Sequence, residues 1–139
     1  MKDFKMLVQQ ELLNIIRKLL RSFEESNSDD AFVFVGSDPG KVIVQVDSNK
    51  VTISIYSISW ENPSIPSVRP VQLATLEWQR FPVSHLRSEM KSLIKIAKEI
   101  RQSLYRCCDR CNQTKPPESM HDGSNTCQAC AVRFLGVIY

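Results

Sequence analysis

The stretch CCDRCNQTKPPESMHDGSNTCQAC, residues 107–130, holds all five cysteines of a chain of 139 residues. Cys108 and Cys111 form one Cys-x-x-Cys pair, and Cys127 and Cys130 form a second pair fifteen residues later. Two such pairs at this separation are typical of a zinc site, because each short turn brings two thiolates to the same ion. Four thiolates fill a tetrahedral shell, so we expect a structural Zn²⁺ with these four residues as its ligands.

Two other residues of this stretch could bind a metal. Cys107 would pair with Cys111 only at a longer spacing, so we expect it to be a bystander beside the site. His121 is the one plausible substitute ligand, but four cysteines already fill the shell, which favours a surface histidine. Residues 128–135 contain no helix breaker and predict a short helix that starts at the second pair. That order predicts a treble clef, with a zinc ribbon as the open alternative.

The cysteine stretch resembles the zinc-binding half of treble-clef nucleases of the phage recombination-endonuclease type. The resemblance rests on Cys108-x-x-Cys111, Lys115-Pro116 and Cys127-x-x-Cys130, about 25 residues, and does not extend to residues 1–105. It implies a zinc-binding fold for this stretch. Catalytic histidines and an acid or Asn follow the second cysteine pair in those nucleases, whereas residues 131–139 hold no His, Asp, Glu or Asn. The resemblance therefore implies the metal fold without the nuclease activity.

Residues 1–105 read as a separate α+β domain, followed by a zinc-binding module at 106–139. Residues 2–23 repeat apolar side chains at steps of three and four, which predicts an amphipathic helix, and residues 24–30 predict a polar loop. Residues 31–35 are rich in Phe and Val and predict a strand. Alternating side chains in residues 41–46 and 50–58 predict two more strands, in an antiparallel meander with one solvent-exposed face. One face of that meander is expected to carry Val42, Val44, Val46, Val51, Ile53 and Ile55.

The segment between the meander and the second helix is harder to interpret. Residues 60–70 contain three prolines and predict a loop. Residues 71–78 predict a fourth strand, although several of their residues would also suit a helix. Residues 82–105 predict a long second helix with one apolar stripe, made of Leu86, Met90, Leu93, Ala97, Ile100 and Leu104. The meander is therefore expected to have three to four strands.

Composition and charge exclude some classes of function. The hydrophobic content of 42% suits a globular protein, and the net charge of +3 is too small to indicate nucleic acid or a membrane surface by itself. No apolar run reaches the roughly 20 residues that span a bilayer, and the N-terminal residues do not resemble a signal peptide. We therefore expect a cytoplasmic protein with reduced thiols and no membrane partner.

Three functions are compatible with these observations. No phosphate-binding glycine motif or nucleophile elbow occurs, so an enzyme, such as a nuclease, is the least favoured reading. A nucleic-acid-binding regulator would use the basic ladder of the second helix, namely Arg87, Lys91, Lys95, Lys98 and Arg101, together with the zinc module. The favoured prediction is a non-enzymatic protein-interaction module of the adaptor, immunity or antitoxin type, which binds another protein.

Overall fold

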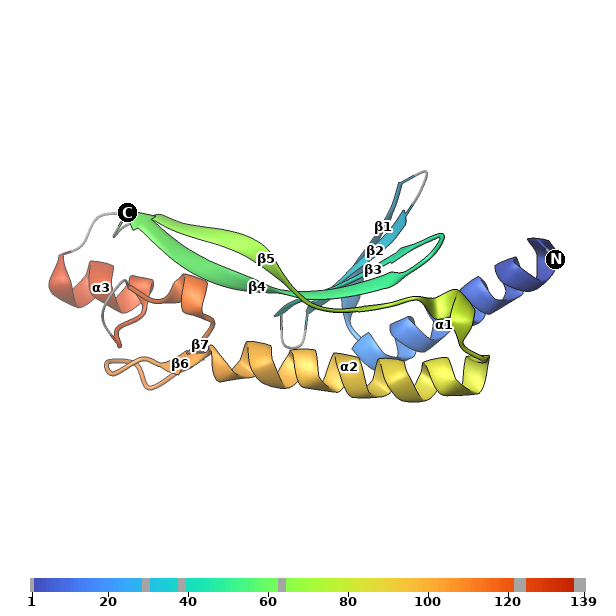
Figure 1. Ribbon diagram of the computed structural model, residues 1–139. Coiled ribbons are helices and arrows are strands. Elements are labelled where there is room, and N and C mark those ends of the chain that lie inside the picture. Colours follow the sequence, from blue (N-terminus) through green and yellow to red (C-terminus); the bar gives the residue numbers. More distant parts are fainter. Residues whose placement is uncertain (1, 29–30, 38–39, 63–64, 122–124, 137–139) are drawn as a thin grey trace.

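A computed structural model describes residues 2–28, 31–37, 40–62, 65–121 and 125–136. The fold is α+β, with a five-stranded antiparallel sheet, two long helices and a small cysteine-containing module at the C-terminal end (Figure 1). The α+β class and the order of helix, meander and helix are therefore confirmed. The sheet has five strands where three to four were predicted.

The sheet is a meander in which each strand pairs with its neighbours in the sequence, in the order β1-β2-β3-β4-β5. The strands are β1 (Phe23–Asn27), β2 (Ala31–Ser37), β3 (Gly40–Asp47), β4 (Val51–Asn62) and β5 (Ile65–Leu76). Alternation along β3 and β4 buries the predicted apolar set: Val42, Val44, Val46, Val51, Ile53 and Ile55. These side chains share a face because successive residues of a strand point to opposite sides.

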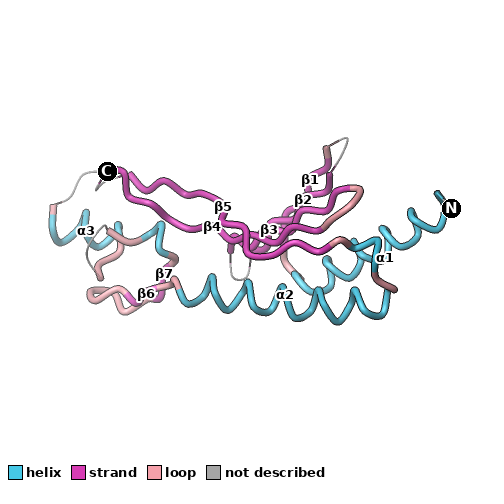
Figure 2. The backbone as a smooth tube through the Cα atoms, viewed as in Figure 1, coloured by secondary structure: helices cyan, strands magenta, loops and turns pink. Residues whose placement is uncertain are grey.

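Two helices cover that apolar face (Figures 1 and 2): α1 (Lys2–Leu20) and α2 (Val83–Ser103). The helices contribute the other buried core residues: Leu12, Leu13, Ile15, Ile16 and Leu20 from α1, and Leu86, Met90, Ile94 and Ala97 from α2. Close approach of α1 to the sheet depends on Gly36 of β2, where an added Cβ would lie 3.3 Å from the Leu20 side chain. The core is therefore a single layer between the sheet and the helix pair.

The first helix ends earlier than predicted, and the polar loop after it is partly a strand. Arg21 has a left-handed backbone with φ of 64°, and its N–H bonds to the Arg17 carbonyl, which ends the helix. Phe23 consequently belongs to β1, where its ring packs edge-on against Phe34 of β2. Arg17 of α1 pairs with Glu25 of β1 at 2.7 Å. The prediction of a loop at residues 24–30 was wrong for β1 (Phe23–Asn27), while residues 29–30 lie outside the described chain.

The predicted loop at residues 60–70 is also wrong for its described residues. β4 continues to Asn62 and β5 begins at Ile65, so the two strands form a long hairpin, which reaches over the C-terminal module (Figure 1). Prolines are tolerated here because β5 is an edge strand, and an edge strand has one side free of ladder hydrogen bonds. The predicted fourth strand at 71–78 is thus the second half of β5, which ends at Leu76.

A buried tryptophan joins the hairpin to the second helix. The 3-10 turn η1 (Trp78–Arg80) follows β5, and Trp78 donates its indole N–H to the Asp47 carbonyl at 3.0 Å. Asp47 also accepts the N–H groups of Asn49 and Lys50 in the turn between β3 and β4. Burial alone would raise the pKa of Asp47, but these bonds and the charge of Lys50 lower it overall. Pro82 then precedes α2, in agreement with the predicted start of that helix.

The apolar stripe of α2 is confirmed in part. Leu86, Met90 and Ala97 are buried as predicted, but Ile100 is 37% exposed and Ile94 takes part in the core instead. Arg101 is buried on the same side of the helix. None of the helices in the described part of the chain has the length and apolar content that crossing a membrane requires.

The C-terminal module consists of short elements. They are β6 (Arg106–Cys107), β7 (Thr114–Lys115), the 3-10 turn η2 (Pro117–Ser119) and α3 (Gln128–Leu135). β6 and β7 pair as a two-stranded hairpin separate from the main sheet. The boundary predicted at residue 105 falls in the short link between α2 and β6, and the division into two domains stays a prediction.

Candidate metal centre

The four cysteines of the two predicted pairs lie together. The sulfur atoms of Cys108, Cys111, Cys127 and Cys130 all lie within 4.8 Å of one another. The Cys111 and Cys127 sulfurs are 3.9 Å apart, which is too long for a disulfide bond. Four sulfurs placed tetrahedrally about 2.3 Å from a zinc ion would be about 3.8 Å apart. The cluster therefore has the dimensions of a tetrahedral metal site.

The first pair lies in the turn that joins β6 to β7. Cys108 donates its backbone N–H to the Gln113 carbonyl at 2.9 Å, and Asn112 donates to the Cys108 carbonyl at 3.0 Å. Asn112 adopts a left-handed backbone with φ of 60°, which asparagine tolerates better than most residues. The turn aims the N–H groups of Arg110 and Cys111 at the Cys108 sulfur, at 3.4 and 3.5 Å. Those N–H groups stabilise a thiolate at Cys108.

The second pair lies at the beginning of α3. Cys127 immediately precedes the helix, Cys130 is in its first turn, and the Ala131 N–H bonds to the Cys127 carbonyl at 2.8 Å. Residues three apart in a helical turn lie on one side, so both thiols face the first pair. The predicted short helix at residues 128–135 is confirmed. The N–H of Cys127 also bonds to the Cys108 sulfur, at 3.3 Å, which joins the two pairs directly.

The four thiols are not electrostatically equivalent. Burial alone would raise the pKa of Cys108, but hydrogen bonds from the N–H groups of Cys111, Cys127 and Arg110 lower it to about 6. Burial raises the pKa of Cys130 to about 12, and the neighbouring cysteine sulfurs add to this rise. Negative charge at one sulfur opposes ionisation of the next, so a cation at the centre would favour the state in which all four are thiolates.

Polar contacts outside the sulfur cluster hold the two pairs in place. Thr126 donates its hydroxyl to an Asp109 carboxylate oxygen at 2.7 Å, and the Asp109 N–H bonds to the Asn125 carbonyl at 2.7 Å. These bonds connect the residue after Cys108 to the residues before Cys127. Orienting contacts of this kind reduce the freedom of the ligands before a metal arrives.

The other two candidates are not part of the sulfur cluster among the described residues. Cys107 is exposed and its sulfur lies 3.7 Å from the Cys108 carbonyl oxygen. His121 is half-buried, and its backbone N–H bonds to the Thr126 carbonyl at 2.8 Å. The earlier histidine, His85, lies on α2, where it stacks on Phe81 with ring centroids 5.0 Å apart. The geometry thus groups the same four cysteines that the spacing selected.

A buried arginine connects the module to the rest of the fold. Arg101 is fully buried near the end of α2 and donates to the Tyr56 carbonyl of β4 at 2.9 Å. Its guanidinium also pairs with the Glu118 carboxylate of η2. The Glu118 backbone carbonyl in turn accepts a bond from the Gln128 side chain of α3 at 3.2 Å. Arg101 therefore ties the second helix and the sheet to the residues between the two cysteine pairs.

This contact corrects the predicted basic ladder of α2. Under the alternative of nucleic-acid binding, Arg101 was expected to contact the nucleic acid, but it is inside the protein and paired with Glu118. Lys98 is half-buried and donates to the Leu19 carbonyl of α1 at 2.9 Å. Arg87, Lys91 and Lys95 are exposed. Sequence reasoning missed the role of Arg101, although its position four residues after Ala97 places it on the buried side of the helix.

Comparisons of the chain with models of protein families, with curated proteins and with solved structures found no match.

Proposed function

We propose that this chain is a non-enzymatic binding protein, in which a structural zinc ion holds the C-terminal module and an apolar surface contacts another protein. The choice of zinc is supported by the ligand set, because four thiolates in a tetrahedral cluster suit Zn²⁺. Four protein ligands leave no position for water, which favours a structural ion. A hairpin turn with one pair and a helix start with the other support a treble clef over a ribbon.

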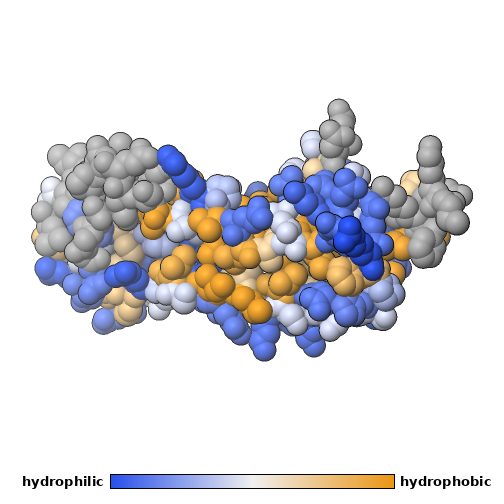
Figure 3. Space-filling view, in the orientation of Figure 1, coloured by the Kyte–Doolittle hydropathy of each residue, from blue (hydrophilic) through white to orange (hydrophobic). Residues whose placement is uncertain are grey.

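The observation that carries the proposed function is a set of exposed apolar side chains on α2 and β5. Ile96 and Ile100 of α2 are 49% and 37% exposed, and Val71 of β5 is 45% exposed. Val71 pairs with Ile55 and shares its face of the sheet, the face that α2 covers. In Figure 3 apolar side chains gather along the middle of the molecule, where Figure 1 draws β5 and α2. We call Val71, Ile96 and Ile100 the β5–α2 surface.

Such a surface is typical of a contact with another protein, since apolar groups left in water are costly unless a partner covers them. Strand addition is a poor explanation for it. The free edge of β5 contains Pro70, whose nitrogen cannot donate to an added strand. A partner is therefore expected to contact side chains of the β5–α2 surface, with an apolar face of its own.

Fewer cations of the basic ladder are exposed in the structure than the sequence predicted, so the ladder gives weaker support for nucleic-acid binding. Arg101 is paired in the interior and Lys98 is bonded to α1, which leaves three of the five proposed cations exposed. Each lost phosphate contact reduces the affinity for a polyanion. Protein binding is consequently the function that we favour.

The test uses single substitutions on the β5–α2 surface. A partner is captured with the intact zinc-loaded protein, purified, and its affinity measured directly by calorimetry. Ile96→Glu and Val71→Glu should each weaken binding by at least about tenfold, because each places a charge in an apolar contact. Ser88→Glu, an equal charge change at an exposed position of α2, should leave the affinity unchanged.

Two results would contradict the proposal. Equal affinity of the partner for the intact protein and for Ile96→Glu would remove the β5–α2 surface from binding. Light scattering could instead show that the protein self-associates and that Ile96→Glu abolishes this association. The β5–α2 surface would then bind a second copy of this chain and not a different protein. Cys127→Ser separately tests the module, since equal partner recovery from this variant would disconnect zinc from binding.

A further inference from the structure

A groove runs along the seam between the two long helices. It consists of two hollows of about 410 and 280 Å³, both of which are bounded by Leu19 of α1 and Lys91 of α2. The first hollow continues along α2 to Gln102, and the second reaches back to Arg87. The fifteen helical steps from Arg87 to Gln102 correspond to a length of about 22 Å. We call this region the α1–α2 groove, and it is long enough for about four turns of a helix.

The floor of the groove is apolar. Ile15 of α1 and Ile94 of α2 are almost completely buried at 5% and 2% exposure, and Leu19 is half-buried between the two hollows. Aliphatic side chains at the bottom of a groove between helices are suited to the apolar face of another helix. None of the described residues that line the groove has an aromatic ring on which a nucleic-acid base would stack.

The rim of the groove is basic. Lys18 lines it from α1, and Arg87, Lys91 and Lys95 line it from α2, against the two acidic residues Glu11 and Glu99. Among the described residues, none of these four cations makes a hydrogen bond or ion pair to another side chain. Arg87, Lys91 and Lys95 follow one another at four-residue steps, about 6 Å apart along the helix. Like charges at that spacing repel, so this arrangement destabilises α2 when no anionic group lies beside the three cations.

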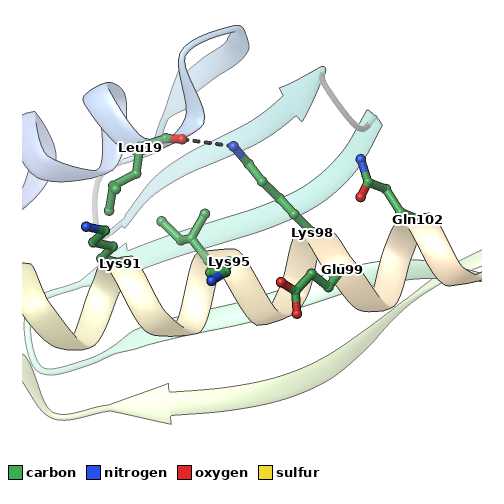
Figure 4. Close-up of a pocket in the computed structure, with 7 residues that line it drawn as sticks. Leu19, Lys91, Lys95, Lys98, Glu99 and Gln102 are labelled. Carbon is green, nitrogen blue, oxygen red and sulfur yellow. Dashed lines mark hydrogen bonds between the residues drawn. The ribbon is translucent and has the colours of Figure 1, made fainter.

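Lys98 has a different role from its neighbours. Its ammonium group donates to the Leu19 carbonyl at 2.9 Å, close to the C-terminal end of α1 (Figure 4). That end carries a partial negative charge, which would repel an anion from the groove, and Lys98 offsets it. Figure 4 also shows Lys91 extending from α2 on the side of Leu19. The remaining cations are therefore available to an anionic ligand.

We propose that the α1–α2 groove binds an amphipathic helix of a partner protein, with its apolar face on Ile15, Leu19 and Ile94 and its carboxylates beside Lys18, Lys91 and Lys95. Charge complementarity is the reason for an acidic partner, and the aliphatic floor is the reason for a helix and not a nucleic acid. This site goes beyond the β5–α2 surface, since Ile96 and Ile100 lie on the opposite flank of α2 from Lys91 and Lys98.

The experiment uses the full-length zinc-loaded protein and designed peptides. The probe is a labelled peptide of about 18 residues with leucines along one helical face and glutamates beside them, long enough to form a helix. Fluorescence anisotropy measures its binding at low ionic strength, about 0.05 M, where screening is weak. Three comparison probes are used: a peptide with Lys for each Glu, a peptide with Gln for each Leu, and an oligothymidine of about 20 nucleotides.

The variant Lys91→Glu/Lys95→Glu should weaken binding of the acidic peptide by at least about tenfold. The same variant should gain binding to the lysine peptide, which the intact protein should not bind. Lys41→Glu/Lys50→Glu changes the net charge equally outside the groove and should bind the acidic peptide as the intact protein does. Ile96→Glu should also bind it normally, which separates this site from failure of the proposed function.

Several outcomes would overturn the inference. The first is that the intact protein does not bind the acidic peptide. The second is that Lys91→Glu/Lys95→Glu binds this peptide as tightly as the intact protein does. The third is that the leucine-free peptide binds as tightly as the acidic peptide, which would mean that the apolar floor makes no contact. An oligothymidine affinity equal to that of the acidic peptide, lost in the same groove variant, would assign the groove to phosphates. Circular dichroism and zinc content are measured for every variant, and values equal to those of the intact protein would establish that the substituted proteins are folded.

Discussion

The helix-and-sheet body and the cysteine module differ in what each one buries. The body packs aliphatic and aromatic side chains from two helices and the sheet into one core, which includes Phe34, Trp78 and Met90. The buried cluster of the module is Cys108, Met120, Cys127 and Cys130, and three of its four members are cysteines. Apolar burial stabilises a domain in proportion to the area removed from water, so the module has little of its own.

From this contrast we infer that the two ends of the chain differ in their source of stability. The body is large enough to fold by side-chain packing, whereas a unit of about 30 residues ordinarily requires a metal or disulfides. The proposed zinc ion supplies that requirement in the module. Arg101 and Glu118 then join the two regions through a buried ion pair. Three predictions test this contrast, each at a different point.

The largest effect is expected on removal of the metal. Structural zinc in small modules contributes about 10–16 kcal/mol at neutral pH, so a chelator should unfold the module. Hydrogen exchange should rise in residues 106–121 and 125–136 and stay low in β3 and β4. Cys130→Ser should reproduce this effect, and Cys107→Ser, a matched control outside the cluster, should retain the metal. Unchanged exchange in the module after complete loss of zinc would contradict the contrast.

The second prediction perturbs the core of the helix-and-sheet body and leaves the cysteine module unchanged. Phe34 is fully buried in the body, and Phe34→Ala should lower the free energy of unfolding by about 3–5 kcal/mol, because the cavity cannot fill. Denaturant unfolding measures this loss, and zinc content should not change. Val33→Ala, a half-buried neighbour on the other face of β2, should cost about 1 kcal/mol or less. Loss of zinc from Phe34→Ala would mean that the two regions do not have separate sources of stability.

The third prediction concerns the connection between the regions. Arg101→Met leaves the Glu118 carboxylate without its cation. The cost should be about 3 kcal/mol, the lower end of the range for a broken buried ion pair, because the Glu118 side chain is still 17% exposed. Limited proteolysis between Ser103 and Arg106 should become faster while zinc stays bound. The double variant Arg101→Met/Glu118→Leu should recover part of the loss, and Lys95→Met should change little. A double variant no more stable than Arg101→Met would assign the loss to packing of the arginine side chain.

The sequence predicted best those features that depend on nearby residues. Alternation in Val42–Val46 and Val51–Ile55 is enough to identify two strands and the face that they bury. β1 was missed because Glu24, Glu25 and Ser26 have low strand propensity, and the strand exists through pairing with β2. Residues 65–70 were missed because proline predicts a loop unless the strand is known to be at an edge.

Arg101 was predicted to be exposed because it is charged, although its position in the helical repeat lies on the buried side. Its position in α2 follows the buried stripe, but a charged residue is rarely buried without a partner, so the ladder of cations was the natural interpretation. Two of its partners are Tyr56, forty-five residues earlier, and Glu118, seventeen residues later. Nothing local to α2 indicates either of them.

The sequence by itself determined which cysteines meet. A Cys-x-x-Cys turn brings two sulfurs together through the geometry of four consecutive residues, and that geometry does not depend on the rest of the chain. Only the tertiary structure decided that Arg101 is an internal contact and that Lys91 and Lys95 flank a groove with an apolar floor. Those roles depend on which segments pack together, and packing is set by the whole core.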